Sequence, residues 1–504
     1  MDSLIAFAHG LVVALEPLNL GVMVIGVLVG VIAGALPGIS FVNAMAIALP
    51  FTYFMSPLVA MMFLSGIYVG GVFGGSISSL LVNIPGDPDS LPSCWDGYPI
   101  SRRDGPERAL SIAITASAIG GLFSALLLSF ASPPFARFAL SFDQPEFFAA
   151  TFMGLVSVLS ISKGNLLLSL LSLFLGVAIG SIGTDPLYGV TRLTFGIGIL
   201  DNGIDFVVVM IGLFAIGEVL DLIASRRAPD MTTREEARMR ILRPRDIWNL
   251  RGSISRGTGV GSLIGIIPGA GAAVGALVAY GIERQLNPRR DEFGTGVEDG
   301  LAAPEASKNA TTGTAMIPLL TLGIPGSAAA AIMLAALTLH GVQPGPLLYS
   351  KSPDMLYAIF ASFTLANLFM VVVSAAVARG FGMLMRVDAT IICAFIVVFS
   401  VVGAFGVRNN IADVFICMAF GILGFYMKRF GFPAAPLVLG VILGPLAEGY
   451  LMTSMANYHD DLTIFFTRPK SAVLMAFAFL FILWALSPEL KYAYRRLRER
   501  FGGG

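Results

Sequence analysis

The chain of 504 residues contains 56% hydrophobic residues and only 13% charged ones, and its 32 basic and 32 acidic side chains cancel. A soluble protein would carry a charged share of about 25%, so the composition excludes a soluble protein and indicates a polytopic membrane protein embedded in a lipid bilayer. No nucleic-acid partner is expected. Three scattered cysteines, Cys94, Cys393 and Cys417, lack metal-ligand spacing, so we expect buried thiols and neither a metal site nor a cofactor.

The chain begins with a short helical segment and continues with long apolar runs. Residues 1–15 carry Asp2 and no basic region, which predicts an amphipathic lead-in helix rather than a cleavable signal. Runs such as 18–36, 58–82 and 109–131 approach the ~20 residues that a spanning helix needs. With shorter and broken segments included, we expect about ten to fourteen membrane segments.

One pattern of motifs occurs twice along the chain. Gly30-x-x-x-Gly34-x-x-Pro37-Gly38 returns as Gly261-x-x-x-Gly265-x-x-Pro268-Gly269, and Asn83-Ile84-Pro85-Gly86 returns as Gly323-Ile324-Pro325-Gly326. The copies are separated by nearly equal lengths of chain, which indicates an internal duplication. The sequence therefore predicts an all-α fold of two homologous membrane halves, residues 1–225 and 252–487.

Basic residues predict how these halves are oriented. Residues 226–251 form a basic linker and residues 488–504 a basic tail, and the positive-inside rule places both in the cytoplasm. The charges that follow the two motifs exchange places between the halves, because Arg102, Arg103 and Arg108 follow the second motif in the first half whereas Arg284 follows the first motif in the second half. This exchange favours an inverted repeat, although a parallel repeat with altered loop charges remains an alternative.

The Pro-Gly pairs predict where the helices break. Proline removes an amide donor and glycine adopts dihedrals closed to other residues, so each pair interrupts a helix, and broken backbone in a membrane must face protein or a polar cavity. Freed amides there can bind an anion and freed carbonyls a cation. The predicted substrate-binding residues are Pro37, Gly38, Asn83, Pro85, Gly86, Pro268, Gly269, Lys308, Asn309, Pro325, Gly326 and Ser327.

The segments before the second motifs carry further candidates and their structural alternatives. The hydroxyls of Ser76, Ser78, Thr311 and Thr312 are candidate ligands of a coupling ion. Lys308 can neutralise a substrate carboxylate, or it can be a side chain that snorkels beside Glu305. A run of small residues that fits a binding cavity also has a purely structural alternative, the close packing of helices. This run consists of Gly70, Gly71, Gly74 and Gly75.

Taken together, the motifs resemble those of the large membrane subunit of the tripartite tricarboxylate transporter family, TctA. The resemblance spans essentially the whole chain and rests on Gly34-Ala-Leu-Pro37-Gly38, Asn83-Ile-Pro-Gly86, Asp96-Gly97-Tyr98-Pro99 and the run 318–327. It implies a multi-pass protein of the bacterial inner membrane that works with a small membrane subunit and a periplasmic substrate-binding protein. It also implies secondary uptake of an organic carboxylate, driven by a cation gradient.

Two departures from the family pattern bear on the substrate. The segment 87–95 reads Asp-Pro-Asp-Ser-Leu-Pro-Ser-Cys-Trp where the family often has small residues, and Lys308-Asn309 stands where a neutral pair is expected. The added acids and Trp95 can alter the wall of the cavity, which puts a citrate-like substrate in doubt, and Lys308-Asn309 can tune the choice of substrate.

The function predicted from these features is that of a carrier, not of an enzyme. No nucleotide-binding Gly-x-x-x-x-Gly-Lys-Ser/Thr motif occurs in the sequence, which supports coupling to a sodium or proton gradient, and the hydroxyls favour sodium. The alternative from another class is an ion or anion channel that uses the broken helices as a filter.

Overall fold

The computed structural model describes residues 2–36, 40–161, 166–185, 189–225, 239–269, 271–384 and 389–501. These residues divide into two compact units, and each draws on both halves of the sequence. The larger unit comprises Met1–Leu140, Val207–Ile267 and Gly271–Phe425, and the smaller unit comprises Ser141–Phe206, Pro268–Ala270 and Tyr426–Gly504.

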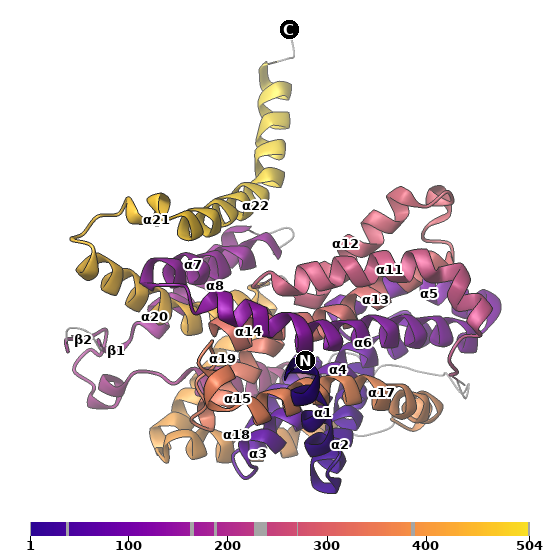
Figure 1. Ribbon diagram of the computed structural model, residues 1–504, viewed down its shortest axis with the longest axis horizontal. Helices are drawn as coiled ribbons and strands as arrows, with labels where there is room; N and C mark the ends of the chain where they lie inside the picture. The colour runs from indigo at the N-terminus through magenta and orange to yellow at the C-terminus, as the bar shows by residue number, and fades with distance from the viewer. Residues whose placement is uncertain are drawn as a thin grey trace. The chain divides into compact units, whose positions relative to one another are not determined.

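Helices make up almost all of the described structure (Figure 1). The first half of the sequence contains α1 (Asp2–Ala14), α2 (Pro17–Ala35), α3 (Phe41–Thr52), α4 (Pro57–Val82), η1 (Pro88–Ser90), α5 (Leu91–Asp104), α6 (Pro106–Ala139), α7 (Gln144–Ile161), α8 (Leu166–Gly180), β1 (Gly183–Thr184), β2 (Thr191–Arg192), η2 (Gly198–Asn202), α9 (Phe206–Met210), the π-helix η3 (Ile211–Ile216) and α10 (Gly217–Ser225). Strands β1 and β2 form a small antiparallel pair.

The second half of the sequence repeats this helical character. It contains α11 (Pro244–Ile266), α12 (Gly271–Leu286), η4 (Arg290–Glu292), α13 (Glu298–Thr314), α14 (Met316–Leu322), α15 (Ala328–Leu339), α16 (Leu348–Lys351), α17 (Pro353–Leu384), α18 (Ala389–Arg408), α19 (Ile411–Arg429), α20 (Ala434–Asn457), α21 (Ile464–Thr467) and α22 (Pro469–Phe501).

Seven of the described helices are long and apolar enough to cross a membrane: α2, α4, α6, the stretch Phe206–Ala224, α17, α19 and α20. Six shorter apolar helices accompany them, including α3, α8 and α15. The all-α polytopic fold predicted from the composition is therefore confirmed. The three cysteines are buried, as expected.

The larger unit contains the same sequence of elements twice. In the first half, α2 ends just before Pro37, α3 follows, and α4 ends at the Asn83 motif. In the second half, α11 ends just before Pro268, α12 follows, and α13 and α14 end at the Gly323 motif. Helix α2 packs on α4 and α11 packs on α13, while α6 packs on α13 and α17 on α4. The two halves thus share element order and partners, whereas their relative orientation in the membrane stays a prediction.

Glycine allows the close approach of these paired helices. A Cβ on Gly30 would lie 2.2 Å from the carbonyl oxygen of Ile67, and one on Gly261 would lie 2.1 Å from that of Ser307. Across from α2, a Cβ on Gly70 or Gly74 would lie 2.5 Å from a carbonyl oxygen of that helix. The packing interpretation of these α4 glycines is therefore confirmed, since any side chain there would separate the helices.

The boundary predicted at the end of the linker and the boundary predicted at the start of the tail fall within helices. Residues 226–238 of the linker lie outside the described residues, and Pro244–Arg251 is the first part of α11. The backbone amides of Arg240 and Leu242 donate to hydroxyls of Ser111 and Thr115 on α6, at 3.2 Å and 3.0 Å. Helix α22 runs through residue 488, where the predicted tail begins, to Phe501.

Candidate functional site

Both Ile-Pro-Gly motifs lie where a helix ends in a left-handed residue. Asn83 has φ 58° at the end of α4, and Gly323 has φ 74° at the end of α14. This conformation stops a helix and is favoured by glycine and asparagine. The following proline cannot donate to a preceding turn, so the chain leaves the helix at equivalent points in the two halves.

Each Ile-Pro-Gly glycine lies against the second glycine of its own half's Gly-x-x-x-Gly pattern. A Cβ on Gly86 would lie 2.0 Å from the Gly34 carbonyl oxygen and 2.7 Å from Gly75 Cα. A Cβ on Gly326 would lie 3.3 Å from the Gly265 carbonyl oxygen. The two motifs of each half, far apart in sequence, therefore lie side by side. We call Pro85-Gly86 the first break and Pro325-Gly326 the second break, and the first break is packed more tightly.

We expect Gly86→Ala to destabilise the protein far more than Gly326→Ala. The added methyl at residue 86 would overlap backbone atoms that belong to two packed helices, at a cost of ~3 kcal/mol or more, whereas the contacts at residue 326 allow a shift of a few tenths of an ångström. Thermal unfolding of the purified variants in detergent measures the difference. Equal midpoints for the two variants would contradict the packing described here.

A buried ion pair lies beside the first break. Lys308 Nζ on α13 lies 3.2 Å from Glu305 Oε1, and both side chains are 0% exposed. Lys308 also donates to the hydroxyls of Ser76 on α4 and of Ser90 at the end of η1, the latter at 3.2 Å. The snorkelling alternative is therefore wrong, because the ammonium is enclosed by protein rather than extended to a surface.

Three serines from the first half complete the surroundings of Glu305. Ser76 donates to both carboxylate oxygens at 2.8 Å and 3.0 Å, Ser117 on α6 donates to Oε2 at 2.9 Å, and Ser93 on α5 donates to Oε1. Such hydrogen bonds offset part of the cost of removing a charge from water. We call Ser76, Ser90, Ser93, Ser117, Glu305 and Lys308 the buried polar cluster.

Two further carboxylates lie next to this cluster. Asp87 and Asp89 are 4% and 3% exposed. The backbone amide of Phe41, at the start of α3, donates to Asp87 Oδ2 at 3.1 Å, and the Ser90 hydroxyl donates to Asp89 Oδ1 at 3.0 Å. The structure thus brings together the two departures from the family pattern, which are the acidic segment 87–95 after Asn83-Ile84-Pro85-Gly86 and Lys308.

The remaining predicted residues are distributed more widely. Pro37 and Gly38 lie outside the described residues, Asn83 is exposed, and Ser327 caps α15 while its hydroxyl lies 3.5 Å from that of Tyr68. Gly269 has φ 83°, and the carbonyl of Pro268 accepts from Ser157.

Among the coupling-ion candidates Ser76 alone belongs to the buried polar cluster, whereas the hydroxyls of Ser78, Thr311 and Thr312 donate to helix carbonyls. Asn309 is buried on α13, and its amide nitrogen donates to the sulfur of Met370.

Sequence reasoning missed the roles of Ser90, Ser93 and Ser117. Ser90 and Ser93 lie in the acidic segment that the sequence had singled out, so their position was the available signal. Ser117 lies in an apolar run of α6 and carries no local signal, because its role depends on the packing of α6 against α13.

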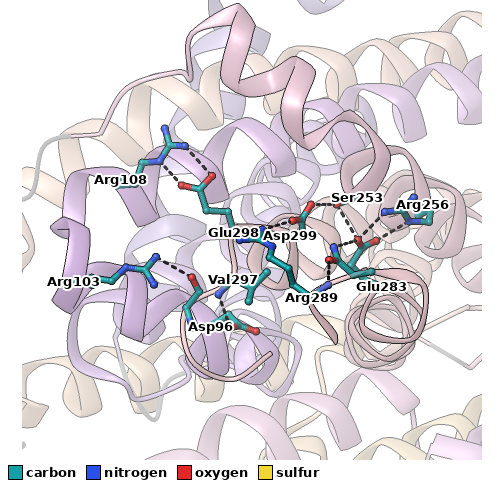
Figure 2. A network of polar contacts seen from close by, with 12 residues as sticks. Asp96, Arg103, Arg108, Ser253, Arg256, Glu283, Arg289, Val297, Glu298 and Asp299 are labelled. Atoms are coloured by element: carbon teal, nitrogen blue, oxygen red, sulfur yellow. Dashed lines mark hydrogen bonds and ion pairs between the residues drawn. The ribbon is translucent and has the colours of Figure 1, made fainter. Parts of the chain in front are cut away.

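Asp96, in the Asp-Gly-Tyr-Pro motif, holds the loop that precedes α13 (Figure 2). Its Oδ1 accepts from the amides of Gly294, Gly296 and Val297 at 2.9, 2.9 and 2.8 Å, and its Oδ2 accepts from the Tyr280 hydroxyl at 3.0 Å. Burial, and then the charge of Asp96, raise the pKa of Tyr280, so its hydroxyl remains a donor. An acid of the first half thereby fixes the start of the helix that carries Lys308.

Ion pairs around this loop hold the same elements together. The guanidinium of Arg108, at the start of α6, donates two hydrogen bonds to the Glu298 carboxylate, at 2.7 Å and 2.8 Å. The guanidinium of Arg256 likewise donates two hydrogen bonds to the carboxylate of the fully buried Glu283, at 2.7 Å each (Figure 2). Paired, bidentate geometry of this kind fixes orientation as well as distance. The network positions α11, α12 and α13 relative to α5 and α6.

A separate cavity of about 620 Å³ lies in the smaller unit, between residues 180–204 and α20. None of the predicted site residues lines it, and its one arginine, Arg192, already pairs with Glu448 and Asp185. We therefore place the candidate site at the breaks, where buried charge needs an explanation.

Comparison with known proteins agrees with the resemblance seen in the motifs. The profile of the tripartite tricarboxylate transporter TctA family matches residues 20–439. A protein of Agrobacterium vitis described as an "Uncharacterized 52.8 kDa protein in TAR-I ttuC' 3'region" is 35% identical over 495 residues, which cover 97% of this chain and 98% of that protein. A second from that organism, described as an "Uncharacterized protein in TAR-II ttuC' 3'region", is 35% identical over 231 residues, 46% of this chain and 96% of that protein. No solved structure matches the chain. The chain belongs to the tripartite tricarboxylate transporter TctA family.

Proposed function

We propose that this chain is the membrane carrier subunit of a receptor-dependent secondary transporter that imports a tricarboxylate or a related organic carboxylate. Membership of the TctA family makes it a component of a tripartite tricarboxylate transporter and points to transport rather than catalysis. The finer proposal names its partners as a small membrane subunit and a periplasmic substrate-binding protein. It places the carrier in a bacterial inner membrane, with residues 226–251 and the C-terminus in the cytoplasm.

The observation that carries the proposal is the buried polar cluster together with the two aspartates next to it, at the Pro85-Gly86 break. Four charged side chains, Asp87, Asp89, Glu305 and Lys308, are enclosed within the helical unit. Burying charge in a membrane protein is costly, and such residues usually mark the path of a substrate or ion. A purely structural bundle would not need them.

The paired breaks support alternating access as the mechanism. In carriers built from repeats, interrupted helices of both halves face one central site, and one group of helices moves relative to the other. Here we propose that residues 1–225 and 252–487 are the two repeats, related by inversion, and that Pro325, Gly326 and Ser327 contribute to the anion side of the site. An elevator-like movement fits this arrangement.

Reconstituted uptake tests the proposal. Proteoliposomes containing the chain, its small subunit and its binding protein are expected to accumulate labelled carboxylate only when the binding protein and one imposed cation gradient, sodium or proton, are both present. Vesicles without the chain are the control. Uptake that persists without the binding protein would contradict receptor dependence, and single-channel currents in place of saturable uptake would favour the channel.

A further inference from the structure

The charges at the first break do not balance. Three carboxylates, those of Asp87, Asp89 and Glu305, surround a single ammonium, that of Lys308, and all four are at most 4% exposed. Burial is the largest influence on both aspartates and raises the pKa of each; the charge of Asp89 raises the pKa of Asp87 further, whereas the charge of Lys308 lowers both. The ammonium, however, contacts Glu305, and neither aspartate makes a salt bridge with any described residue.

One carboxylate oxygen at this place has no partner. Asp89 Oδ2 is buried and makes no hydrogen bond, although Oδ1 of the same side chain accepts from Ser90. Buried polar atoms are nearly always satisfied, and an unsatisfied carboxylate oxygen is more costly than a neutral one. The Oδ2 atom of Asp89 is therefore available to contact one positively charged ligand.

The donors available here restrict which cation fits. They are carboxylate and hydroxyl oxygens, the ligands that hard cations prefer. No described group of three or more His, Cys, Asp or Glu side chains is arranged to hold a metal ion. With Lys308 paired to Glu305, only two carboxylates and one hydroxyl remain, fewer than the roughly six to eight oxygen ligands that calcium takes, so we assign a monovalent ion.

We propose that Asp87, Asp89 and Ser90 bind a sodium ion, with Asp89 Oδ2 as its principal ligand, and that Lys308 is the counterion of Glu305 rather than a ligand of the carboxylate substrate. The identification of this sodium as the coupling ion rests on the carrier function proposed above. The existence of the site does not, because it rests on the buried carboxylates and on the unpartnered Oδ2 of Asp89.

The site also connects the ion to both halves of the chain. Asp87 accepts from the first amide of α3, Ser90 accepts from Lys308 on α13, and a Cβ on Gly75 of α4 would lie 2.5 Å from the Ser90 hydroxyl. Ion binding would therefore change the charge between α3, α4 and α13 at once. This is the property that a coupling ion requires, since it must bias the packing of one half against the other.

Binding of ²²Na⁺ to the full chain in lipid nanodiscs, without substrate or partner proteins, tests the site. The wild type is expected to bind sodium saturably, and Asp89→Asn, which keeps the size of the side chain, is expected to bind it at least ten-fold more weakly. Asp104→Asn is the matched control, because Asp104 ends the same helix that follows Ser90 but is paired with Arg103 at the surface. Ser90→Ala provides a second variant should Asp89→Asn fail to fold.

Three outcomes would overturn the site: unchanged sodium binding in the folded Asp89→Asn or Ser90→Ala variant, calcium that displaces ²²Na⁺ more effectively than unlabelled sodium does, or an absence of saturable binding in the wild type. Sodium binding that depends on Asp89, combined with a lack of uptake in the reconstituted system, would instead contradict the carrier function alone. Uptake without this binding would place the coupling ion elsewhere.

Discussion

Replacing Lys308 by methionine is expected to lower the free energy of unfolding by about 3–5 kcal/mol, because Glu305 would remain buried without a counterion. The loss is large for one substitution, since the serines around Glu305 donate hydrogen bonds but bring no charge. Heating the purified variant in detergent and measuring the fraction that remains folded by size-exclusion chromatography gives the shift. Lys351→Met, the same change at an exposed position, is expected to stay within ~0.5 kcal/mol of the wild type.

Combining Lys308→Met with Glu305→Gln separates the effect of the buried charge on stability from the effect of side-chain shape. The glutamine oxygen can still accept from Ser76 and Ser117, and no charge of the pair remains buried, so the double variant is expected to recover most of the stability lost in Lys308→Met. A Lys308→Met protein as stable as Lys351→Met would show that the pair is not enclosed as described. If the double variant folds, its uptake activity reports on transport without a folding defect.

Asp96→Ala is expected to cost about 4 kcal/mol or more. Three backbone amides and one hydroxyl lose a charged acceptor, and each such hydrogen bond contributes about 1.5–3 kcal/mol when considered alone. The loop 294–297 should then be released from α5, so the amides of Gly294, Gly296 and Val297 should exchange hydrogen for deuterium faster. Hydrogen-exchange mass spectrometry and thermal unfolding measure the two effects.

Two further variants sharpen this test. Asp96→Asn keeps an oxygen acceptor without the charge, so its loss of stability should be smaller than that of Asp96→Ala. Asp104→Ala lies on the same helix, but its partner is the neighbouring Arg103 at the surface, and it should change stability by ~0.5 kcal/mol or less. Unchanged exchange at residues 294–297 in Asp96→Ala would show that this carboxylate does not hold the loop.

The candidate site was partly readable in the sequence. Pro85 and Pro325 identify the helix breaks because proline and glycine act on the backbone wherever they occur, and the left-handed Asn83 and Gly323 agree with that interpretation. Lys308 attracted notice because it lies within the motif region and a cation there can neutralise a substrate carboxylate. Ser76 attracted notice as a candidate ion ligand, whereas Ser90, Ser93 and Ser117 did not, because serine occurs in helices for several reasons and only the neighbouring helix decides among them.

The sequence by itself determined the class of protein, the two Ile-Pro-Gly helix breaks and the family, since these depend on composition, on motifs and on local backbone chemistry. Only the tertiary structure decided that Lys308 is enclosed and paired with Glu305, that Asp89 retains an unpartnered oxygen, and that Gly86 is more tightly packed than Gly326. The physical reason is that burial depends on which helices pack together: Lys308 and Glu305 are only three residues apart on α13, but they are enclosed by first-half residues such as Ser76, which is 229 residues from Glu305. A linear pattern carries no information about that packing.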